Sequence, residues 1–597
     1  MSKFTIHKEV QTTMNYTLNK NSEEKNKTWQ SVKRLFPMLD GEKKNLIISS
    51  IAIFINSVLN LLAPFLIGYA IDAYIQTKDY SGVYLFGVLL LGIYLLILVA
   101  SYVQTRVMGG VAQRLIFKLR SAIFLKLQEL PIAFFNQNKA GDLISRINSD
   151  TEKLNEFFSR SFMQLIGSVF VMIGAGIFLL FINIELGAVT LLPAFILITL
   201  TQILTPWVKK ANKRNLQSTG GMSGEIQESL TNFKVIIAFN RRDYFRKRFN
   251  EVNDENFKTG ISAGIANNIF APLYSLAYNI AQLVVLVFGI YLIMHGSFTV
   301  GFLISFFTFT TRFYDPLRQV AALWTSLQVA LAGWDRISEI LALESDLPKT
   351  LQDDVKHEKH LLEFEHVHFG YPDGEEILSD ICIQLEEGKT YALVGPTGGG
   401  KTTTASLMAR LYDPTKGTVY LDGKDIRTYD PMERSKMIGF ILQEPFLFTG
   451  TVGENIVYGN EEYEKYSMEQ LKNLLDETGL LPLLSQFQDG LETKVSLSAD
   501  TISLGQRQLI AFIRAVLRRP KLLILDEATA NIDTITEQLL EEVLQKLPKE
   551  TTRVIIAHRL NTIENADEIF FVNSGGLTQA HSLREAVDML LHGKRES

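Results

Sequence analysis

Long uncharged stretches fill the first half of the chain and stop near its middle. Each contains no Lys, Arg, Asp or Glu, and they cover residues 45–71, 80–105, 161–184, 186–208 and 259–294. A membrane-spanning helix needs about 20 predominantly apolar residues, so each stretch is long enough to span a bilayer. The last one exceeds a hydrocarbon core of about 30 Å, so we expect part of it to lie outside the membrane.

A sixth span is predicted at residues 296–311, where the apolar stretch is shorter. Charges resume at Arg312, but the apolar pattern continues through Phe313 and Tyr314. Arg312 and Asp315 share one helix face, where they either pair with each other or lie at the cytoplasmic interface. The sequence therefore predicts an α-helical transmembrane domain with six spans.

The segments between these spans differ sharply in basic residues. The second and fourth carry nine and eleven Lys or Arg residues, whereas the three short segments together carry only Lys78. Basic loops stay on the cytoplasmic side, which also places both termini there. The long basic loops lack strong breakers over much of their length, as in residues 112–130, and we expect helices that extend well below the membrane. Residues 1–30 are polar and show no basic segment followed by a short apolar one, so no cleavable signal peptide is expected.

The second half of the chain has a different pattern, with short apolar strands alternating with helical stretches. This alternation is typical of an α/β domain. The pattern divides the sequence into a polar cytoplasmic tail (1–30), a transmembrane domain (31–343), a polar linker (344–360) and an α/β domain (361–597).

Composition adds little to this division. The 597 residues are 47% hydrophobic on average, and a net charge of −5 gives no indication of nucleic-acid binding. The single cysteine, Cys382, excludes a disulfide within the chain. Because it lies in an apolar strand pattern, residues 378–385, we expect it to be a small core residue.

A glycine-rich loop is the strongest motif in the α/β domain. It fits G-x-x-x-x-G-K-[ST] and comprises Gly395, Pro396, Thr397, Gly398, Gly399, Gly400, Lys401 and Thr402. A strand pattern at 390–394 precedes it and a helical run through Thr403 follows, which is the context that a phosphate-binding loop requires. We expect Lys401 to reach the β- and γ-phosphates of ATP and the Thr402 hydroxyl to bind Mg²⁺.

Two carboxylates follow a strongly apolar strand later in the domain. Residues 522–525 are Leu-Leu-Ile-Leu, and Asp526 and Glu527 come directly after them. Asp526 suits the Mg²⁺ shell, and Glu527 is placed to orient or deprotonate the attacking water. Alone, such a strand is often followed by ordinary solvated acids, but beside the phosphate loop the catalytic interpretation is favoured.

These motifs together resemble those of ATP-binding-cassette (ABC) exporters, over about residues 30 to 580. The resemblance implies a half-transporter, with a P-loop nucleotide-binding domain fused to the membrane domain. It assigns Tyr371 to stacking on adenine and Gln443 to contacts with Mg²⁺ and the attacking water. It also makes Asp533 the aspartate that communicates with the opposite site, and His558 the switch histidine at the γ-phosphate.

Two segments of the membrane half match the cytoplasmic loops of the same family. Residues 134–135 and 141–146, with Asp150, resemble the first loop, whose short coupling helix docks on a nucleotide domain. Residues 240–245 lie where the second coupling helix is expected, which in the family docks on the partner's nucleotide domain.

The signature segment departs from the family's Leu-Ser-Gly-Gly-Gln. Here Ser503, Gly505 and Gln506 remain, but the first glycine is replaced by Leu504. In the family this segment contacts ATP on the other subunit, and a leucine side chain would crowd a close backbone approach to phosphate. The sequence resembles the catalytically competent member of a heterodimeric bacterial exporter, although a homodimer that tolerates the variant stays open.

The expected function is ATP-driven multidrug efflux of amphipathic or hydrophobic compounds. Many aromatic residues and side-chain amides in the spans suit such substrates, although most aromatics in membrane helices serve packing or face lipid. A lipid or peptide exporter is the alternative on the same scaffold, and an ATP-gated regulatory protein with little turnover is a third possibility. Intact Glu527 and His558 argue against the third.

Overall fold

The computed structural model of the chain describes residues 16–18, 36–344, 347, 360–371, 374–443, 445–496, 502–526, 534–545, 547–556 and 564–592. Its internal contacts divide the chain into two compact units. The membrane unit comprises residues 20–127 and 141–342, and the nucleotide unit comprises residues 1–19, 128–140 and 343–597. In the described residues the membrane unit is entirely helical and all strands belong to the nucleotide unit, which confirms the predicted fold class.

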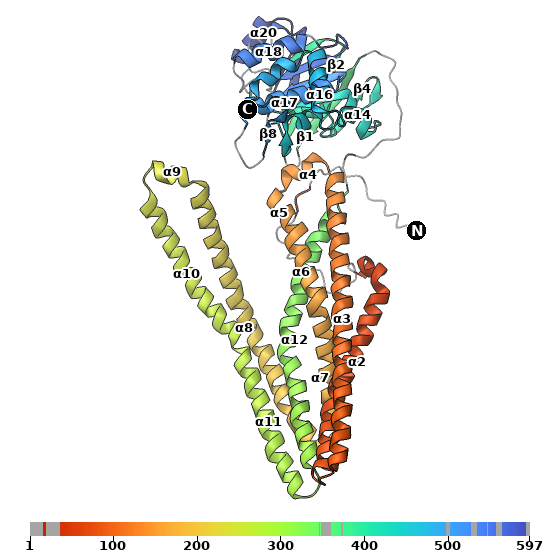
Figure 1. Cartoon of the computed structure of the whole chain (residues 1–597). Helices are drawn as coiled ribbons and strands as arrows, with labels where there is room; N and C mark the ends of the chain where they lie inside the picture. The colour runs from red at the N-terminus through yellow and green to blue at the C-terminus, as the bar shows by residue number, and fades with distance from the viewer. Residues whose placement is uncertain are drawn as a thin grey trace. The chain divides into compact units, whose positions relative to one another are not determined.

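The membrane unit consists of long helices joined by short turns (Figure 1). Its elements are η1 (Phe36–Glu42), α2 (Lys43–Ala70), η2 (Ile71–Ile75), α3 (Tyr80–Glu129), α5 (Ala140–Ser145), η3 (Arg146–Asp150), α6 (Thr151–Glu156), η4 (Phe157–Ser161), α7 (Phe162–Ile182), α8 (Ile184–Thr231), α9 (Phe233–Ala238), α10 (Arg242–Asn268), α11 (Phe270–Met294) and α12 (Val300–Leu341). At about 1.5 Å per residue, the longer of them exceed the thickness of a bilayer. The basic loops are therefore helical, as predicted.

Five helical stretches of the described residues are long and apolar enough to cross a membrane. They are Lys43–Ile75, Tyr80–Glu129, Ala140–Ile182, Ile184–Thr231 and Arg242–Met294. The sixth predicted span, 296–311, falls in a turn and the first part of α12, which is not among these five. The count of six therefore stays a prediction. Arg312 and Asp315 are both exposed on α12.

Aliphatic and aromatic residues form the core of the membrane unit. Helix α12 packs against α2 and α7, and α8 packs against α10 and α11. One core cluster draws its buried residues from five helices: Leu61, Ala175, Leu179, Leu186, Val285, Leu292, Phe306 and Phe309. In this cluster the rings of Phe178 and Phe309 stack with their centroids 5.0 Å apart.

The first cytoplasmic loop is joined to the end of α12 by a buried charge network. Arg146, whose side chain is 1% exposed, bonds to Asp142 at 3.0 Å and to Glu339 at 2.7 Å. Arg336 on α12 pairs with Asp142 and with the fully buried Asp150. Removing one partner would leave a charge buried without compensation, so the network favours a fixed geometry here.

The second predicted coupling segment is displaced from the short helix that the structure contains. Helix α9 covers Phe233–Ala238, whereas residues 240–245 form a turn and the beginning of α10. Asn240 occupies the left-handed region at φ 50° within this turn. The prediction therefore placed the short helix several residues too late.

The described part of the nucleotide unit contains three sheets. Its strands are β1 (Leu362–Gly370), β2 (Glu376–Leu385), β3 (Thr390–Val394), β4 (Lys416–Leu421), β5 (Lys424–Asp425), β6 (Ile438–Ile441), β7 (Gly450–Thr451), β8 (Lys494–Val495), β9 (Leu522–Asp526), β10 (Thr552–Ile556), β11 (Glu568–Asn573) and β12 (Gly576–Ala580). The largest sheet has the order β12-β11-β3-β10-β9-β6, in which all neighbours except β11 and β12 run parallel. A second, antiparallel sheet has the order β2-β1-β4-β5.

Helices surround these sheets and complete the nucleotide unit. They are α4 (Ile132–Gln137), α13 (Lys401–Met408), α14 (Pro431–Met437), α15 (Val452–Val457), α16 (Met468–Glu477), η5 (Leu481–Gln486), η6 (Gly490–Glu492), α17 (Leu504–Leu517), α18 (Thr534–Gln545) and α20 (Leu583–His592). Helix α4 belongs to this unit although its sequence follows α3 of the membrane unit. The short segment 16–18 also lies here, because Asn138 bonds to the backbone of Tyr16 and Leu18.

Candidate functional site

The site lies at one edge of the parallel sheet, where several strands end at motif residues. Strands β3 and β9 both pair with β10, and Ile556 of β10 is in register with Leu393 and with Asp526. Strand β6 pairs with β9 on its other side and ends two residues before Gln443. Because the carboxyl ends of parallel strands meet at the same edge, the phosphate loop, Asp526 and Gln443 all emerge there.

The phosphate loop follows β3 and turns directly into α13. Gly395 has φ 150°, and a Cβ added there would lie 2.1 Å from the carbonyl oxygen of Val572. Gly400 has φ 108° and precedes the first residue of α13, with no side chain to cap the helix. A residue with a Cβ is strained in both places, so the two glycines let the loop close under the helix N-terminus. The N–H groups of that first turn are the donors that a phosphate group requires.

A cavity of about 300 Å³ brings the phosphate loop together with Thr402 and Gln443, two of the three predicted Mg²⁺ ligands. Its lining includes the phosphate loop, Thr402, Thr403 and Gln443. The ammonium of Lys401 donates to the carbonyl oxygens of Gly395 at 2.8 Å and Pro396 at 3.0 Å, inside the same loop. The phosphate loop and Gln443, far apart in sequence, therefore line one cavity.

The residues that would bind ATP and Mg²⁺ fit this cavity in chemistry. Thr402 offers a hydroxyl oxygen and Gln443 an amide oxygen, and Asp526 is 3% exposed at the end of β9. Oxygen ligands of this kind suit Mg²⁺, which retains several waters and binds through few protein groups. Glu527, Asp533 and His558 lie outside the described residues, so their assigned roles stay predictions.

Two tyrosine side chains and one amide side chain connect the cavity to helix α4. The Tyr371 hydroxyl lies 3.4 Å from the hydroxyl of Thr403, and its ring meets the ring of Tyr412 edge-on at 5.4 Å. The Tyr412 hydroxyl accepts a hydrogen bond of 2.8 Å from the amide of Asn136 on α4. Sequence reasoning missed Tyr412 and Asn136, because no local pattern brings together residues 276 positions apart.

Helix α17 carries the signature residues at its N-terminus. Ser503 and Gln506 form a capping box, in which Gln506 N–H donates to the Ser503 hydroxyl at 3.1 Å and Ser503 N–H donates to the Gln506 side chain at 2.9 Å. Leu504 is the first residue of the helix, and its side chain is 36% exposed. Further along, Gln508 donates to the carbonyl oxygen of Gln443 at 3.3 Å, which links this helix to the cavity. Burial lowers the pKa of the Arg514 guanidinium near the end of the helix.

Cys382 is not a core residue, contrary to the prediction. It is exposed on β2, between the buried residues Ile381 and Ile383. The alternation of a strand that is buried on one face explains its position, because Cys382 shares the outward face with Gln384.

Two known families match the two halves of the chain. Residues 46–317 match the ABC transporter transmembrane region, and residues 378–530 match the ABC transporter family. A relative from Bacillus subtilis, "Uncharacterized ABC transporter ATP-binding protein YfiC", is 32% identical over 93% of this chain and 92% of its own length. The chain is an ABC transporter.

Other relatives of this ABC transporter carry more specific names. A protein of Mycobacterium bovis named "Fatty acid ABC transporter ATP-binding/permease protein" is 31% identical over 84% of this chain and 79% of its own length. "Probable multidrug resistance ABC transporter ATP-binding/permease protein YheH" of Bacillus subtilis is 31% identical over 83% of this chain and 73% of its own length. The ABC transporter is a multi-pass plasma-membrane protein with a cytoplasmic nucleotide-binding domain.

Proposed function

We propose that this ABC transporter hydrolyses ATP to export amphipathic or hydrophobic compounds across the plasma membrane, as one half of an exporter dimer. The observation that carries the proposal is the cavity that unites the phosphate loop with Thr402 and Gln443 at the edge of the sheet. Multidrug efflux is the specific form that we favour. The name of the relative YheH supports this choice.

The site residues fit separate roles in binding and hydrolysing Mg²⁺-ATP. The phosphate loop cradles the phosphates through backbone N–H groups, and Lys401 balances the charge of the β- and γ-phosphates. Thr402, Gln443 and Asp526 hold Mg²⁺, and Tyr371 stacks on adenine. Glu527 orients or deprotonates the attacking water and His558 stabilises the γ-phosphate, as the resemblance implies.

Contacts between α4 and the cavity suit the transmission of nucleotide binding to the membrane unit. Asn136 bonds to Tyr412, whose ring touches Tyr371 beside Thr403 of the first turn of α13. A nucleotide that moves Tyr371 therefore acts on α4 through two side chains. Such an effect biases the transport cycle only if ATP binds one global state better than the other.

The position of Leu504 supports a heterodimer. Its partly exposed side chain lies at the first position of α17, where a glycine would allow a phosphate on the opposing subunit to approach. In a homodimer of this chain, both ATP sites would contain a signature with Leu504. A partner with an unaltered signature would complete the cavity of this chain, and the second site would contain Leu504.

A lipid exporter on the same scaffold is the second candidate. The relative from Mycobacterium bovis is named as a fatty acid transporter, and it matches most of this chain. Transport assays with a fluorescent fatty acid and a cationic dye, run side by side, separate the two functions.

Glu527→Gln tests the assigned catalytic role. The substitution removes the charge that activates water but keeps the shape of the side chain, so we expect ATP binding to persist and turnover to fall by about 100-fold or more. The measurement is ATPase activity and binding of a fluorescent ATP analogue by the chain purified together with a second half-transporter of unaltered signature in lipid nanodiscs. Glu564→Gln, a neutralisation of an exposed acid in the same unit, is the matched control and should retain activity. Substantial hydrolysis by the Glu527 variant would show that another group acts as the base.

Co-expression tests the heterodimer. We expect low ATP-dependent dye efflux in vesicles that contain this chain alone and much higher efflux when a second half-transporter with an unaltered signature is present. A stable dimer of this chain alone with full, substrate-stimulated ATPase activity would exclude the heterodimer proposal.

A further inference from the structure

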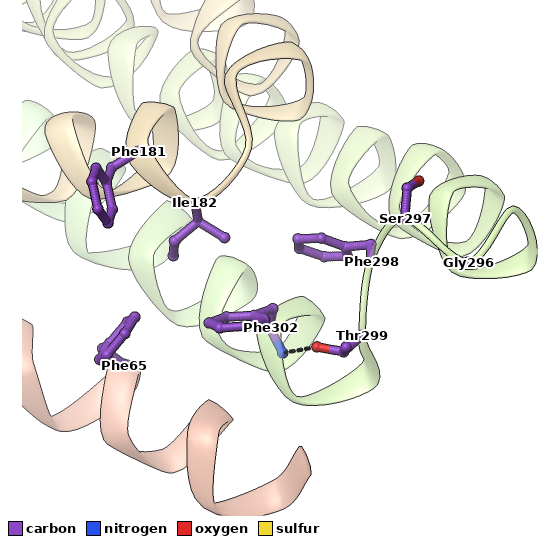
Figure 2. Close-up of a pocket in the computed structure, with 8 residues that line it drawn as sticks. All are labelled: Phe65, Phe181, Ile182, Gly296, Ser297, Phe298, Thr299 and Phe302. Atoms are coloured by element: carbon purple, nitrogen blue, oxygen red, sulfur yellow. Dashed lines mark hydrogen bonds between the residues drawn. The ribbon is translucent and has the colours of Figure 1, made fainter. Parts of the chain in front are cut away.

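A cavity of about 410 Å³ opens at the end of the membrane unit opposite its basic loops. It lies between the end of α7, the turn before α12 and the last part of α2, and five of its side chains converge in Figure 2: Phe65, Phe181, Ile182, Phe298 and Phe302. A volume of this order accommodates a drug-sized molecule. Four of the eight lining residues are phenylalanines, and the cavity lies on the external side.

The aromatic rings are held in place by a close crossing of α2 and α12. A Cβ added to Gly301 would lie 2.1 Å from the carbonyl oxygen of Gly68, so the two backbones touch with no side chain between them. The Ser305 hydroxyl donates to the carbonyl oxygen of Pro64 at 2.9 Å, beside Phe65. Phe65 consequently faces Phe302 with their ring centroids 6.1 Å apart. Close backbone packing therefore positions the side of the cavity that Phe65 and Phe302 form.

Both side-chain hydroxyl groups in the lining donate hydrogen bonds to acceptors within the protein. Ser297 donates to the carbonyl oxygen of Leu292 at 3.1 Å. Thr299 donates to the carboxylate of Asp72 and accepts from the N–H of Phe302 (Figure 2). A hydroxyl group carries one proton, so these groups can offer a ligand only lone pairs. The polar lining therefore favours ligands that donate hydrogen bonds or carry positive charge.

Asp72 adds a negative charge directly behind this lining. Its carboxylate accepts from Thr299, from the N–H of Gly301 at 2.8 Å and from the amide of Gln76 at 3.1 Å. All three donors are neutral, and in the described part of the chain no ion pair involves Asp72. A hydrogen bond to a charged acceptor polarises the donor hydroxyl, which makes the Thr299 oxygen more negative. The charge also disfavours a carboxylate or phosphate ligand in the cavity.

We infer that this external aromatic cavity binds hydrophobic organic cations and discriminates against hydrophobic anions of the same size. Faces of aromatic rings attract cations, and the attraction strengthens where water is displaced. The inference rests on the proposed export function and deepens it, because it favours cationic amphiphiles over fatty acids as substrates.

Two probes of the same shape and opposite charge test the inference. Tetraphenylphosphonium and tetraphenylborate both present four phenyl rings around one central atom. Radiolabelled tetraphenylphosphonium is equilibrated by dialysis with the detergent-purified full chain without nucleotide, and protein-free micelles are subtracted. We expect saturable binding that tetraphenylborate displaces at least about tenfold more weakly than unlabelled tetraphenylphosphonium. Equal or stronger displacement by tetraphenylborate would overturn the charge preference.

Variants locate the binding. Phe302→Leu and Phe65→Leu keep an apolar side chain but remove the ring, and each should weaken tetraphenylphosphonium binding by about fivefold. Phe195→Leu changes an exposed ring on α8 outside the cavity and should leave binding unchanged. Equal loss in all three variants, or no loss in any, would contradict the assignment of the site.

The charge is tested by Asp72→Asn. The amide oxygen can still accept from Thr299, and we expect binding to weaken by about threefold or more because the charge is lost. Asp79→Asn neutralises an acid of the external loop that bonds to Ser81, and it should have little effect. Unchanged binding in the Asp72 variant, with an unchanged thermal unfolding temperature, would exclude a role for its charge.

Because binding is measured without nucleotide, this result is separate from the proposed function. Turnover and efflux without cation selectivity would leave the export proposal standing and overturn the inference. Selective cation binding by a chain that neither hydrolyses ATP nor transports would do the opposite.

Discussion

Two helices of the nucleotide unit begin at motif residues, and their N-termini are built in opposite ways. Helix α13 follows Gly400, which contributes no side chain, so no side chain caps the helix end beside the cavity. Helix α17 follows Ser503, and the Ser503–Gln506 capping box satisfies the N–H groups of these two residues within the helix end. Both ends carry the partial positive charge of a helix dipole, but only α17 has a side-chain cap, and the uncapped end of α13 forms the open side of the site.

This difference matches the division of roles in the proposed mechanism. The α13 terminus belongs to the side on which this chain holds its own ATP. The α17 terminus would act on ATP of the other subunit, and there the chain has a self-sufficient cap and a partly exposed Leu504. A chain in which α13 has no side-chain cap and α17 has one fits a site that a different partner completes.

The largest expected effect comes from the open side. Lys401→Ala removes the only side-chain ammonium among the described residues that line the cavity, and with it two hydrogen bonds to the loop. We expect ATPase activity to fall by about 100-fold or more, because charge stabilisation of the transferred phosphoryl group is lost. ATPase activity and binding of a fluorescent ATP analogue by the chain purified together with a second half-transporter of unaltered signature provide the measurement.

The control for this variant is Lys389→Ala in the same unit. Lys389 pairs with Glu386 and Glu568, which hold its pKa above the usual value, and it lies outside the cavity lining. Its loss should leave activity near that of the unmodified chain. If Lys401→Ala retained half of the activity, ATP hydrolysis would not depend on the cavity beside α13.

The sequence was informative wherever a site forms from local pattern and strand order. The phosphate loop needs only a strand, a glycine-rich turn and a helix in succession, and residues 390–408 contain all three. Gln443 and Asp526 join the loop because they follow parallel strands whose carboxyl ends share one edge. Periodicity and spacing contain this information for the loop and Asp526, whereas the role of Gln443 was implied only by the resemblance to ABC exporters.

Contacts that depend on tertiary packing could not be predicted from the sequence. Nothing local links Asn136 to Tyr412, and nothing in the apolar stretches distinguishes Phe302, which lines a cavity, from Phe306, which is fully buried. Cys382 was misplaced for a different reason. Its apolar stretch was interpreted as buried on both faces, although Gln384 two residues later already marked the outward face of a strand with period two.

A gain of function would sharpen the contrast between the two helix ends. Leu504→Gly restores the glycine that the signature lacks and removes the side chain at the start of α17. If Leu504 limits a dimer of this chain alone, ATPase activity of the purified chain should rise by about tenfold, since roughly 1.4 kcal/mol of crowding at the transition state corresponds to that factor. Leu504→Ala, which shortens the side chain but retains a Cβ, should give a smaller rise. Unchanged activity in both variants would mean that Leu504 does not limit turnover, and the argument for a heterodimer would lose its basis.

The smallest expected effect concerns how the open side communicates with α4. Tyr412→Phe keeps the ring contact with Tyr371 but removes the hydrogen bond from Asn136, and one such bond contributes about 0.5–1.5 kcal/mol. We expect basal ATPase activity to change little, whereas its stimulation by a transported compound falls by about threefold, because nucleotide and membrane events are less tightly linked. Tyr429→Phe removes a comparable bond, to the carbonyl oxygen of Leu421, away from α4, and should leave stimulation intact.

The double variant Tyr412→Phe with Asn136→Ala tests whether the two residues act through their mutual hydrogen bond. If they do, the second substitution adds almost nothing to the effect of the first. Fully additive losses would show that Asn136 and Tyr412 influence transport independently, and α4 would then have to communicate with the cavity by another route.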